Sequence, residues 1–293
     1  MDDATAPLRV TLDQRRADDW ALALLSAGIE SRIDASASGY LVLVAATERL
    51  RADRVLEAFD AENRPPLPEE PEHRDGHGTS LAAVVVAVLL CIAFVITGPG
   101  EWDSVWFKQG AATAWRIDQG EVWRAVTALT LHANFPHLVA NAATLVIFGT
   151  ALCGLVGAGV GIWVLLLAGT AGNWLTAMLR GSAHSAVGAS TAIFGGIGAL
   201  AAIQLIRRRR GAAVSAWKAW APLAAGLALL GFLGTAPESD VLAHLFGFAT
   251  GALLGPAALR AAGWRDRQML QLALSLAAGA IVVIAWIAAF SRA

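Results

Sequence analysis

The chain has 293 residues, of which 56% are hydrophobic and only 15% are charged, and its mean hydropathy is +0.56. This composition excludes an ordinary soluble domain and is typical of a protein with several membrane spans. The formal net charge of -1 excludes a strongly basic chain, so we expect no nucleic-acid partner.

Residues 1–63 are predicted to form a small α+β domain. Strand-like runs such as LRVTL and YLVLVAA alternate with an amphipathic stretch and with a helix through RADRVLEAF, which predicts a βαββα order. The pattern is that of a small regulatory or binding module, and it names no ligand. The opening residues MDDATAPLRV lack a basic stretch followed by an apolar run, so we expect no cleavable signal peptide.

Residues 64–79 are rich in proline, charge and glycine, which predicts an extended linker. From Leu81 onward, apolar runs of about 20 residues alternate with short polar breaks, and this is the length that a helix needs to cross the hydrocarbon core. We therefore expect seven spans, at residues 81–98, 137–156, 159–178, 188–206, 217–235, 241–259 and 269–290.

Three isolated side chains within these spans have simple structural interpretations. Cys91 and Cys153 lie inside apolar runs, so we expect buried thiols rather than a disulfide or a metal site. The polar Asn173 in the third span predicts a contact between helices.

Basic residues set the expected orientation, because positive charges next to short loops stay preferentially in the cytoplasm. The run RRRR (207–210) follows the fourth span, and RAAGWRDR (260–267) follows the sixth. We therefore expect a multi-pass membrane protein with a cytoplasmic N-terminus, and we expect its location to be a bacterial inner membrane. The stretch 99–131 then becomes an external segment whose tryptophans are expected at the membrane interface: Trp102, Trp106, Trp115 and Trp123.

Three groups of polar residues fall at the same expected depth, near the external end of a span: His137 with Asn141, Ser190, and His244. Polar and ionisable side chains are costly inside a bilayer and usually serve a purpose there. One such group alone more often satisfies a nearby carbonyl, but three converging groups favour a site. Because a hydroxyl becomes a nucleophile when a base takes its proton, Ser190 and His244 are candidates for that pair.

Small residues predict that the helices carrying this pair approach closely. On the sixth span Ala243, Gly247 and Gly251 recur every four residues, and small residues also surround Ser190 on the fourth. Such stripes let helix backbones come close together in a membrane. We expect Gly188 to clear space for a substrate chain beside the serine.

The negative charge that develops on a carbonyl oxygen under attack needs hydrogen-bond donors. His137 and Asn141 are four residues apart and share one helix face, so both could donate. The backbone amide of Ser190, at a helix N-terminus, could add a third donor.

Asp240 precedes His244 by one helical turn and has two interpretations. A carboxylate there could orient the imidazole as part of a catalytic triad. In the sequence PESDVLAH, however, the aspartate also fits a helix N-cap, so we expect a dyad and leave open whether Asp240 assists.

The sequence resembles the rhomboid family of intramembrane serine proteases over residues 80–260. The motifs that carry the resemblance are HANFPHLVAN (132–141), GASTAIFG (188–195), AHLFGFATG (243–251) and the pair Trp123–Arg124. The resemblance implies an all-α polytopic membrane protein with a catalytic core of six transmembrane helices, to which residues 261–293 add a seventh. It also implies cleavage of transmembrane or membrane-adjacent segments of other proteins, with neither metal nor other cofactor.

Carried over residue by residue, the resemblance implies the following roles: Ser190 as nucleophile, His244 as general base and acid, and His137 with Asn141 as oxyanion donors. Trp123 and Arg124 match a loop motif that we interpret as structural. His132 matches a recurrent position whose role is less clear and fits a brace for the loop. The site is expected to open toward the external side.

The sequence departs from the family pattern at two positions. Thr191 and Phe246 stand where smaller residues are common, and their bulk puts the fit of the helices and the substrate preference in doubt. Two other functions stay open: a catalytically silent relative that binds membrane proteins for quality control, and a transporter or channel that uses the same polar residues as a path. The presence of both dyad residues favours the protease.

Overall fold

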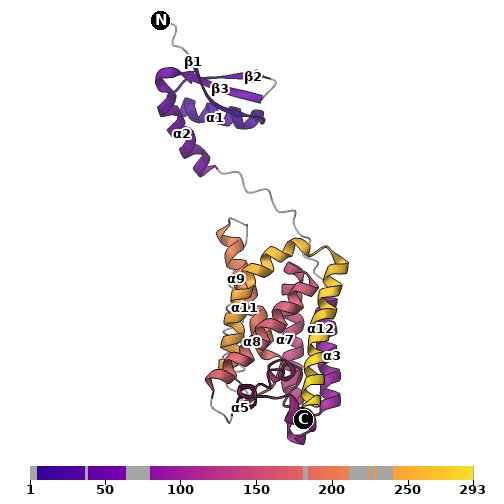
Figure 1. Ribbon diagram of the computed structural model, residues 1–293. Helices are drawn as coiled ribbons and strands as arrows, with labels where there is room; N and C mark the ends of the chain where they lie inside the picture. Colours follow the sequence, from indigo (N-terminus) through magenta and orange to yellow (C-terminus); the bar gives the residue numbers. More distant parts are fainter. Residues whose placement is uncertain are drawn as a thin grey trace. The chain divides into compact units, whose positions relative to one another are not determined.

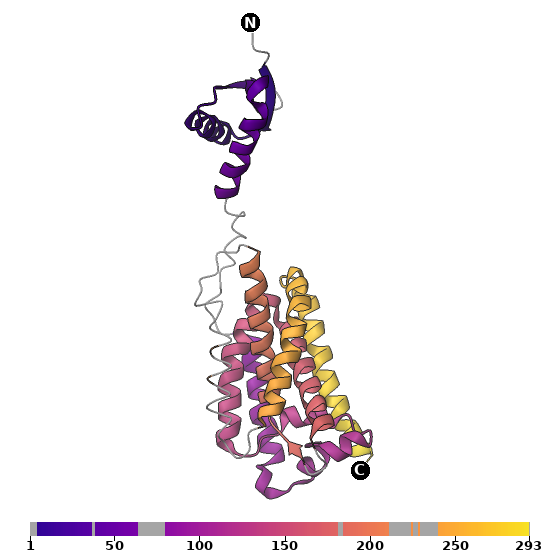
Figure 2. The ribbon, with the colours of Figure 1, turned by 90° about the vertical axis from the view of Figure 1, so that its left-hand side faces the viewer.

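The computed structural model describes residues 5–36, 39–63, 80–180, 184–210 and 240–292, together with Ala224 and Ala228. The chain divides into two compact units, Met1–Pro71 and Glu72–Ala293. The first combines a small sheet with helices and the second is mostly helical (Figures 1 and 2). Of the predicted span at 217–235 the structure describes only Ala224 and Ala228, and the predicted linker at 64–79 lies outside the described residues.

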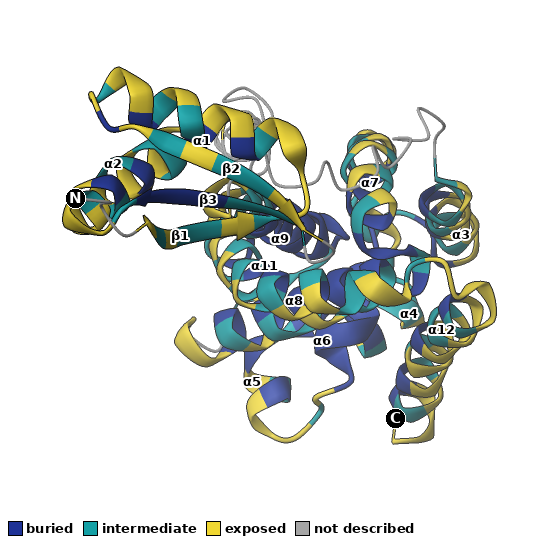
Figure 3. Cartoon of the chain, turned by 90° about the horizontal axis from the view of Figure 1, so that it is seen from above, coloured by how far each residue is buried: buried dark blue, intermediate teal, exposed yellow. Residues whose placement is uncertain are grey.

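The first unit has the predicted βαββα order. Its elements are β1 (Thr5–Thr11), α1 (Gln14–Ser26), β2 (Ser31–Ser36), β3 (Gly39–Ala45) and α2 (Arg49–Glu62). β3 is central and pairs antiparallel with both neighbours, so that Val42 and Val44 are buried against the helices (Figure 3). Asp60 of α2 accepts a hydrogen bond from the indole of Trp20 at 2.9 Å and pairs with Arg9, which ties α2 to α1 and β1.

In the second unit, six of the described helices are long and apolar enough to cross a membrane. They are α3 (Leu81–Thr97), α7 (Phe135–Val156), α8 (Ala158–Leu179), α9 (Ser190–Arg209), α11 (Val241–Ala261) and α12 (Gln268–Ser291). These helices match six of the seven predicted spans within a few residues. The protein buries 67% of the apolar window of α9 and only 17% of that of α12, so α9 forms the centre of the bundle (Figure 3).

A segment of short elements joins α3 to α7. It contains α4 (Val105–Gly110), β4 (Ala112–Thr113), α5 (Ala114–Asp118) and α6 (Arg124–Thr127), and β4 pairs antiparallel with β5 (Ser185–Ala186). The expected interfacial tryptophans divide into two groups. Trp102 and Trp115 are exposed, whereas Trp123 is buried and Trp106 packs edge-on against Trp286 of α12. The prediction was wrong for Trp123 because α12 covers this part of the segment.

α12 is held to the bundle near both of its ends. Near its start, buried Gln271 accepts hydrogen bonds from the backbone N–H groups of Gly159 at 2.8 Å and Val160 at 3.2 Å, and so caps the first turn of α8. Near its end, the indole of Trp286 donates to the hydroxyl of Thr130 at 3.2 Å. The seventh predicted span is therefore anchored to the rest of the second unit near both ends, although the protein buries little of its length.

The two cysteines differ in exposure. Cys153 of α7 is buried, as predicted, but Cys91 of α3 is exposed, so the prediction was wrong for this residue. α3 buries one narrow stripe that includes Ala83, Ala87 and Leu90, and Cys91 lies off that stripe. An apolar run predicts burial in lipid as readily as burial in protein, which is why the sequence did not separate the two.

Candidate active site

The structure brings together Ser190 and His244, which are 54 residues apart in the sequence. Ser190 is the first residue of α9, and its Oγ lies 2.8 Å from Nε2 of His244 on α11. Both side chains are buried. This is hydrogen-bond distance for a hydroxyl and an imidazole, the geometry that transfer of the serine proton requires.

Glycines on α11 allow this contact. A Cβ at Gly247 would lie 2.2 Å from the carbonyl oxygen of Thr191, and one at Gly251 would lie 1.8 Å from that of Gly195. The backbones of α9 and α11 therefore touch directly, and Ala243 completes the buried small face near His244. This is the close helix approach that the spacing of small residues predicts.

The bulk of Thr191, one of the two departures from the family pattern, is accommodated by neighbouring glycines. Its methyl group lies 2.6 Å from where a Cβ of Gly172 would be and 3.1 Å from that of Gly247. Thr191 is buried without displacing the serine that precedes it. Phe246 is only partly buried on α11.

The imidazole of His244 is oriented by an aromatic ring that the sequence analysis missed. The ring of Phe194 stacks on it with centroids 4.4 Å apart and planes inclined by 18°. Phe194 follows Ser190 by four residues and so lies on the same face of α9, a spacing that could have identified it. Nδ1 of His244 is buried and has no hydrogen-bond partner among the residues that the structure describes.

Asp240 is the N-cap of α11. Its Oδ1 accepts a hydrogen bond from the backbone N–H of Ala243 at 3.1 Å, and its Oδ2 lies 2.7 Å from Nε2 of His184. The carboxylate thus makes the capping contact that the sequence predicts, and its second oxygen engages a different histidine from His244.

Gly188 occupies a position that a larger residue could not. Its φ is +126°, and a Cβ there would lie 2.7 Å from Cε1 of His137 and 3.6 Å from Oγ of Ser190. Its backbone N–H donates to the carbonyl of Ala128 at 2.9 Å. The imidazole of His137 and the serine hydroxyl therefore both lie against this glycine.

His137 and Asn141 lie on the same face of α7, as their spacing predicts. α7 begins at an N-cap, Asn134, whose side chain accepts from the backbone N–H of His137 at 2.9 Å. Asn141 is buried, and its amide nitrogen donates to the carbonyl of His137 at 2.9 Å.

His132 lies just before α7 and is fully buried. Its ring packs edge-on against that of His137, with centroids 5.3 Å apart. Burial lowers the pKa of His132 to about 3, and the neighbouring His137 acts in the same direction. His132 is therefore neutral at physiological pH, which suits a bracing group better than a proton carrier.

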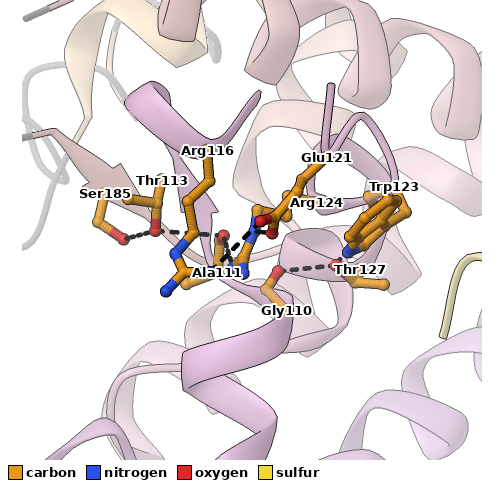
Figure 4. A network of polar contacts seen from close by, with 9 residues as sticks. All are labelled: Gly110, Ala111, Thr113, Arg116, Glu121, Trp123, Arg124, Thr127 and Ser185. Carbon is orange, nitrogen blue, oxygen red and sulfur yellow. Dashed lines mark hydrogen bonds and ion pairs between the residues drawn. The ribbon is translucent and has the colours of Figure 1, made fainter. Parts of the chain in front are cut away.

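Trp123 and Arg124 belong to a polar network that does not include Ser190 or His244 (Figure 4). The guanidinium of Arg124 is fully buried, donates to Glu121 at 2.6 Å, and donates to the carbonyl of Ala111 at 3.0 Å. The network holds the α4–α6 segment, and through the pairing of β4 with β5 it supports the residues just before Gly188. Asn173 joins the same region, since its amide donates to the carbonyl of Ala125 at 3.0 Å.

Comparison with known proteins finds one family along this part of the chain. A family model of the Rhomboid domain matches residues 119–261. YdcA of Bacillus subtilis, a rhomboid-named protein, is 33% identical over 138 residues, which are 47% of this chain and 68% of that protein.

Two further relatives match over a smaller share of their own length. Rhomboid protease GluP of the same bacterium is 32% identical over 43% of this chain and 24% of its own. RHOMBOID-like protein 1 of Arabidopsis thaliana is 33% identical over 47% of this chain and 35% of its own. The matches to these two relatives therefore span about a third or less of their length.

Proposed function

Because this chain belongs to the rhomboid family, we propose that it is an intramembrane serine endopeptidase that acts through a dyad of Ser190 and His244. The single observation that carries the proposal is the 2.8 Å contact between Oγ of Ser190 and Nε2 of His244 at the end of two transmembrane helices. A buried hydroxyl paired with an imidazole is the minimal arrangement for nucleophilic catalysis on a carbonyl.

In the first half-reaction, Oγ of Ser190 attacks the carbonyl carbon of the scissile peptide bond while Nε2 of His244 takes the hydroxyl proton. The oxyanion that forms accepts hydrogen bonds from the side chains of His137 and Asn141 and from the amide of Ser190. The tetrahedral intermediate collapses, the C–N bond breaks, and His244 gives its proton to the leaving amine. The result is an ester between Ser190 and the N-terminal part of the substrate.

In the second half-reaction, water attacks the ester carbonyl and His244 takes a proton from it. The same donors stabilise the second oxyanion, and its collapse releases a carboxylic acid and returns the proton to Oγ of Ser190. Phe194 holds the imidazole plane through both steps by stacking on it at 4.4 Å. The proposal is a dyad, and among the described residues Nδ1 of His244 has no hydrogen-bond partner.

The proposed substrates are membrane proteins cut in or next to a transmembrane segment, and the proposed location is a bacterial inner membrane. The arginines at the ends of α9 and α11 support a cytoplasmic location for those ends. The dyad lies at the opposite ends of the same helices, so the proposed active site opens toward the external side.

The proposal is tested by labelling the full-length protein in membranes with a fluorophosphonate probe, which reacts with activated serines. We expect labelling of the wild type at Ser190, and labelling and cleavage of a model transmembrane substrate should fall by about a thousandfold or more in Ser190→Ala and in His244→Ala. Ser275→Ala is the matched control, because Ser275 is a serine of α12 that donates to the carbonyl of Gln271.

Retained cleavage by Ser190→Ala would refute the assignment of the nucleophile. Binding of a transmembrane substrate without probe labelling or cleavage by the wild type would favour the catalytically silent alternative instead.

A further inference from the structure

A second polar contact lies near the dyad, and the mechanism above does not use it. Nε2 of His184 lies 2.7 Å from Oδ2 of Asp240, and the side chains are only 19% and 10% exposed. Arg180 also faces the carboxylate, with Nη2 3.7 Å from Oδ1, but its side chain is 47% exposed. The short, nearly buried histidine contact is therefore the stronger of the two.

His184 belongs to the strand segment that leads to the serine. Its carbonyl accepts from the backbone N–H of Ala114 at 2.9 Å, and the next two residues form β5, which pairs with β4. Gly188 then donates to the carbonyl of Ala128. These contacts fix residues 184–188 against the segment that joins α3 to α7, so His184 is anchored at the residue just before β5.

Asp240 defines where α11 begins. Its side chain accepts from Ala243, and its backbone carbonyl accepts from the N–H of His244 at 3.0 Å, the hydrogen bond that starts the helix at the histidine. Any shift of Asp240 is therefore transmitted to the turn that carries the imidazole.

We propose that His184 and Asp240 form a clasp that positions His244 against Ser190. The clasp joins the strand that leads to the nucleophile to the N-cap of the helix that carries the base, and both residues are positioning residues. From Gly247 onward, the glycines of α11 hold this helix against α9. The first turn of α11 comes before Gly247, so these glycines do not fix it. This inference rests on the proposed protease function. It adds a contact that maintains the distance between Oγ of Ser190 and Nε2 of His244.

The experiment compares variants of the full-length protein by the rate of probe labelling at Ser190 and by kcat and KM on a transmembrane substrate. His184→Ala removes the clasp and leaves the cap. Asp240→Ser keeps an N-cap oxygen but is too short to serve both Ala243 and His184. His184→Gln places an amide donor near the position of Nε2 and is the conservative rescue variant.

We expect His184→Ala and Asp240→Ser each to lower kcat and the labelling rate by about tenfold with little change in KM, because a small misplacement of a catalytic group costs rate rather than affinity. The double variant should be no slower than either single one, since both remove the same contact. His184→Gln should recover to within about twofold of the wild type, and Arg180→Ala should change the rate by less than about twofold.

The experiment distinguishes failure of the protease proposal from failure of the clasp. Absence of labelling in the wild type would overturn the proposed function itself. Normal labelling of the wild type with unchanged rates in His184→Ala, or multiplied losses in the double variant, would overturn the clasp. A large loss in Asp240→Ser with none in His184→Ala would instead assign Asp240 to a triad. A melting temperature for each variant separates lost positioning from lost folding. If His184→Ala does not fold, unchanged rates in Asp240→Ser would overturn the clasp.

Discussion

The buried asparagines Asn141 and Asn173 in the second unit make two different kinds of hydrogen bond. Asn173 donates to the carbonyl of Ala125, on a separate element 48 residues away. Asn141 donates to the carbonyl of His137, four residues earlier on its own helix. In an α-helix that carbonyl is also the acceptor for the backbone N–H of Asn141. The bond of Asn173 therefore holds tertiary structure, whereas that of Asn141 adds little to the helix.

This contrast predicts opposite effects of removing the two amides. Asn141→Ala should lower kcat by about tenfold to a hundredfold with a small change in KM, because the amide is proposed to act on the oxyanion. Asn173→Ala should lower the free energy of unfolding by about 1–3 kcal/mol, since it leaves the carbonyl of Ala125 without its partner. Steady-state kinetics and thermal unfolding in detergent measure both. An unchanged kcat in Asn141→Ala would contradict its role.

At the scale of elements, contact between α9 and α11 depends on the absence of side chains. A methyl group at Gly251 would meet the carbonyl oxygen of Gly195 at 1.8 Å, far inside van der Waals contact. Backbone cannot move aside as the end of a flexible side chain can, so the helices would have to separate. The proposed dyad spans the same two helices, and the 2.8 Å contact between Ser190 and His244 depends on that separation.

We therefore expect Gly251→Ala to destabilise the protein by about 1–3 kcal/mol and to reduce labelling of Ser190, although no reacting group is touched. Gly279→Ala is the matched control, because a Cβ at this glycine of α12 would meet nothing within 4 Å. The control should keep full labelling and an unchanged or slightly higher melting temperature. Equal behaviour of the two variants would show that the close approach does not matter.

α12 is the last helix of the chain, and hydrogen bonds join it to α8. Gln271 caps the first turn of α8, and the indole of Trp163 on α8 donates to the carbonyl of Leu274 at 2.9 Å. A buried side-chain amide in a membrane bundle is costly unless it is satisfied, and here both its oxygen and its nitrogen are bonded.

At the scale of the whole molecule, the two compact units have separate cores. The first packs Trp20, Leu24, Val42 and Leu56 between its sheet and helices, and the second centres on α9. A unit with its own hydrophobic core can in principle fold alone. The residues proposed for catalysis all belong to the second unit.

Deletion of residues 1–63 should therefore leave probe labelling of Ser190 within about twofold of the full-length rate. Labelling is measured in membranes and normalised to the amount of inserted protein. Loss of labelling from a correctly inserted, folded deletion variant would show that the first unit acts on the site. The same residues produced alone should give a cooperative thermal transition.

The membrane class and six of the helices followed from local pattern, and Ser190 and His244 were singled out by their similar expected depth and by the resemblance to the family. A helix must be about 20 apolar residues long to cross the hydrocarbon core, and small residues four apart form one helix face. The length of a span and its small-residue face can therefore both be identified from a short stretch of sequence. The N-cap at Asp240 and the position of Asn141 on the face of His137 are local in the same sense.

The tertiary structure decided which side chains meet. The contact of Ser190 with His244, the partner of Asp240 across 56 residues, and the ring that stacks on His244 depend on how α9 and α11 pack and on where β5 is anchored. Whether an apolar residue faces lipid or protein was decided at the same level, as the exposed Cys91 and the buried Trp123 show. The physical reason is that spacing along a helix places a residue on a face, whereas the neighbour of that face is set by packing between distant segments.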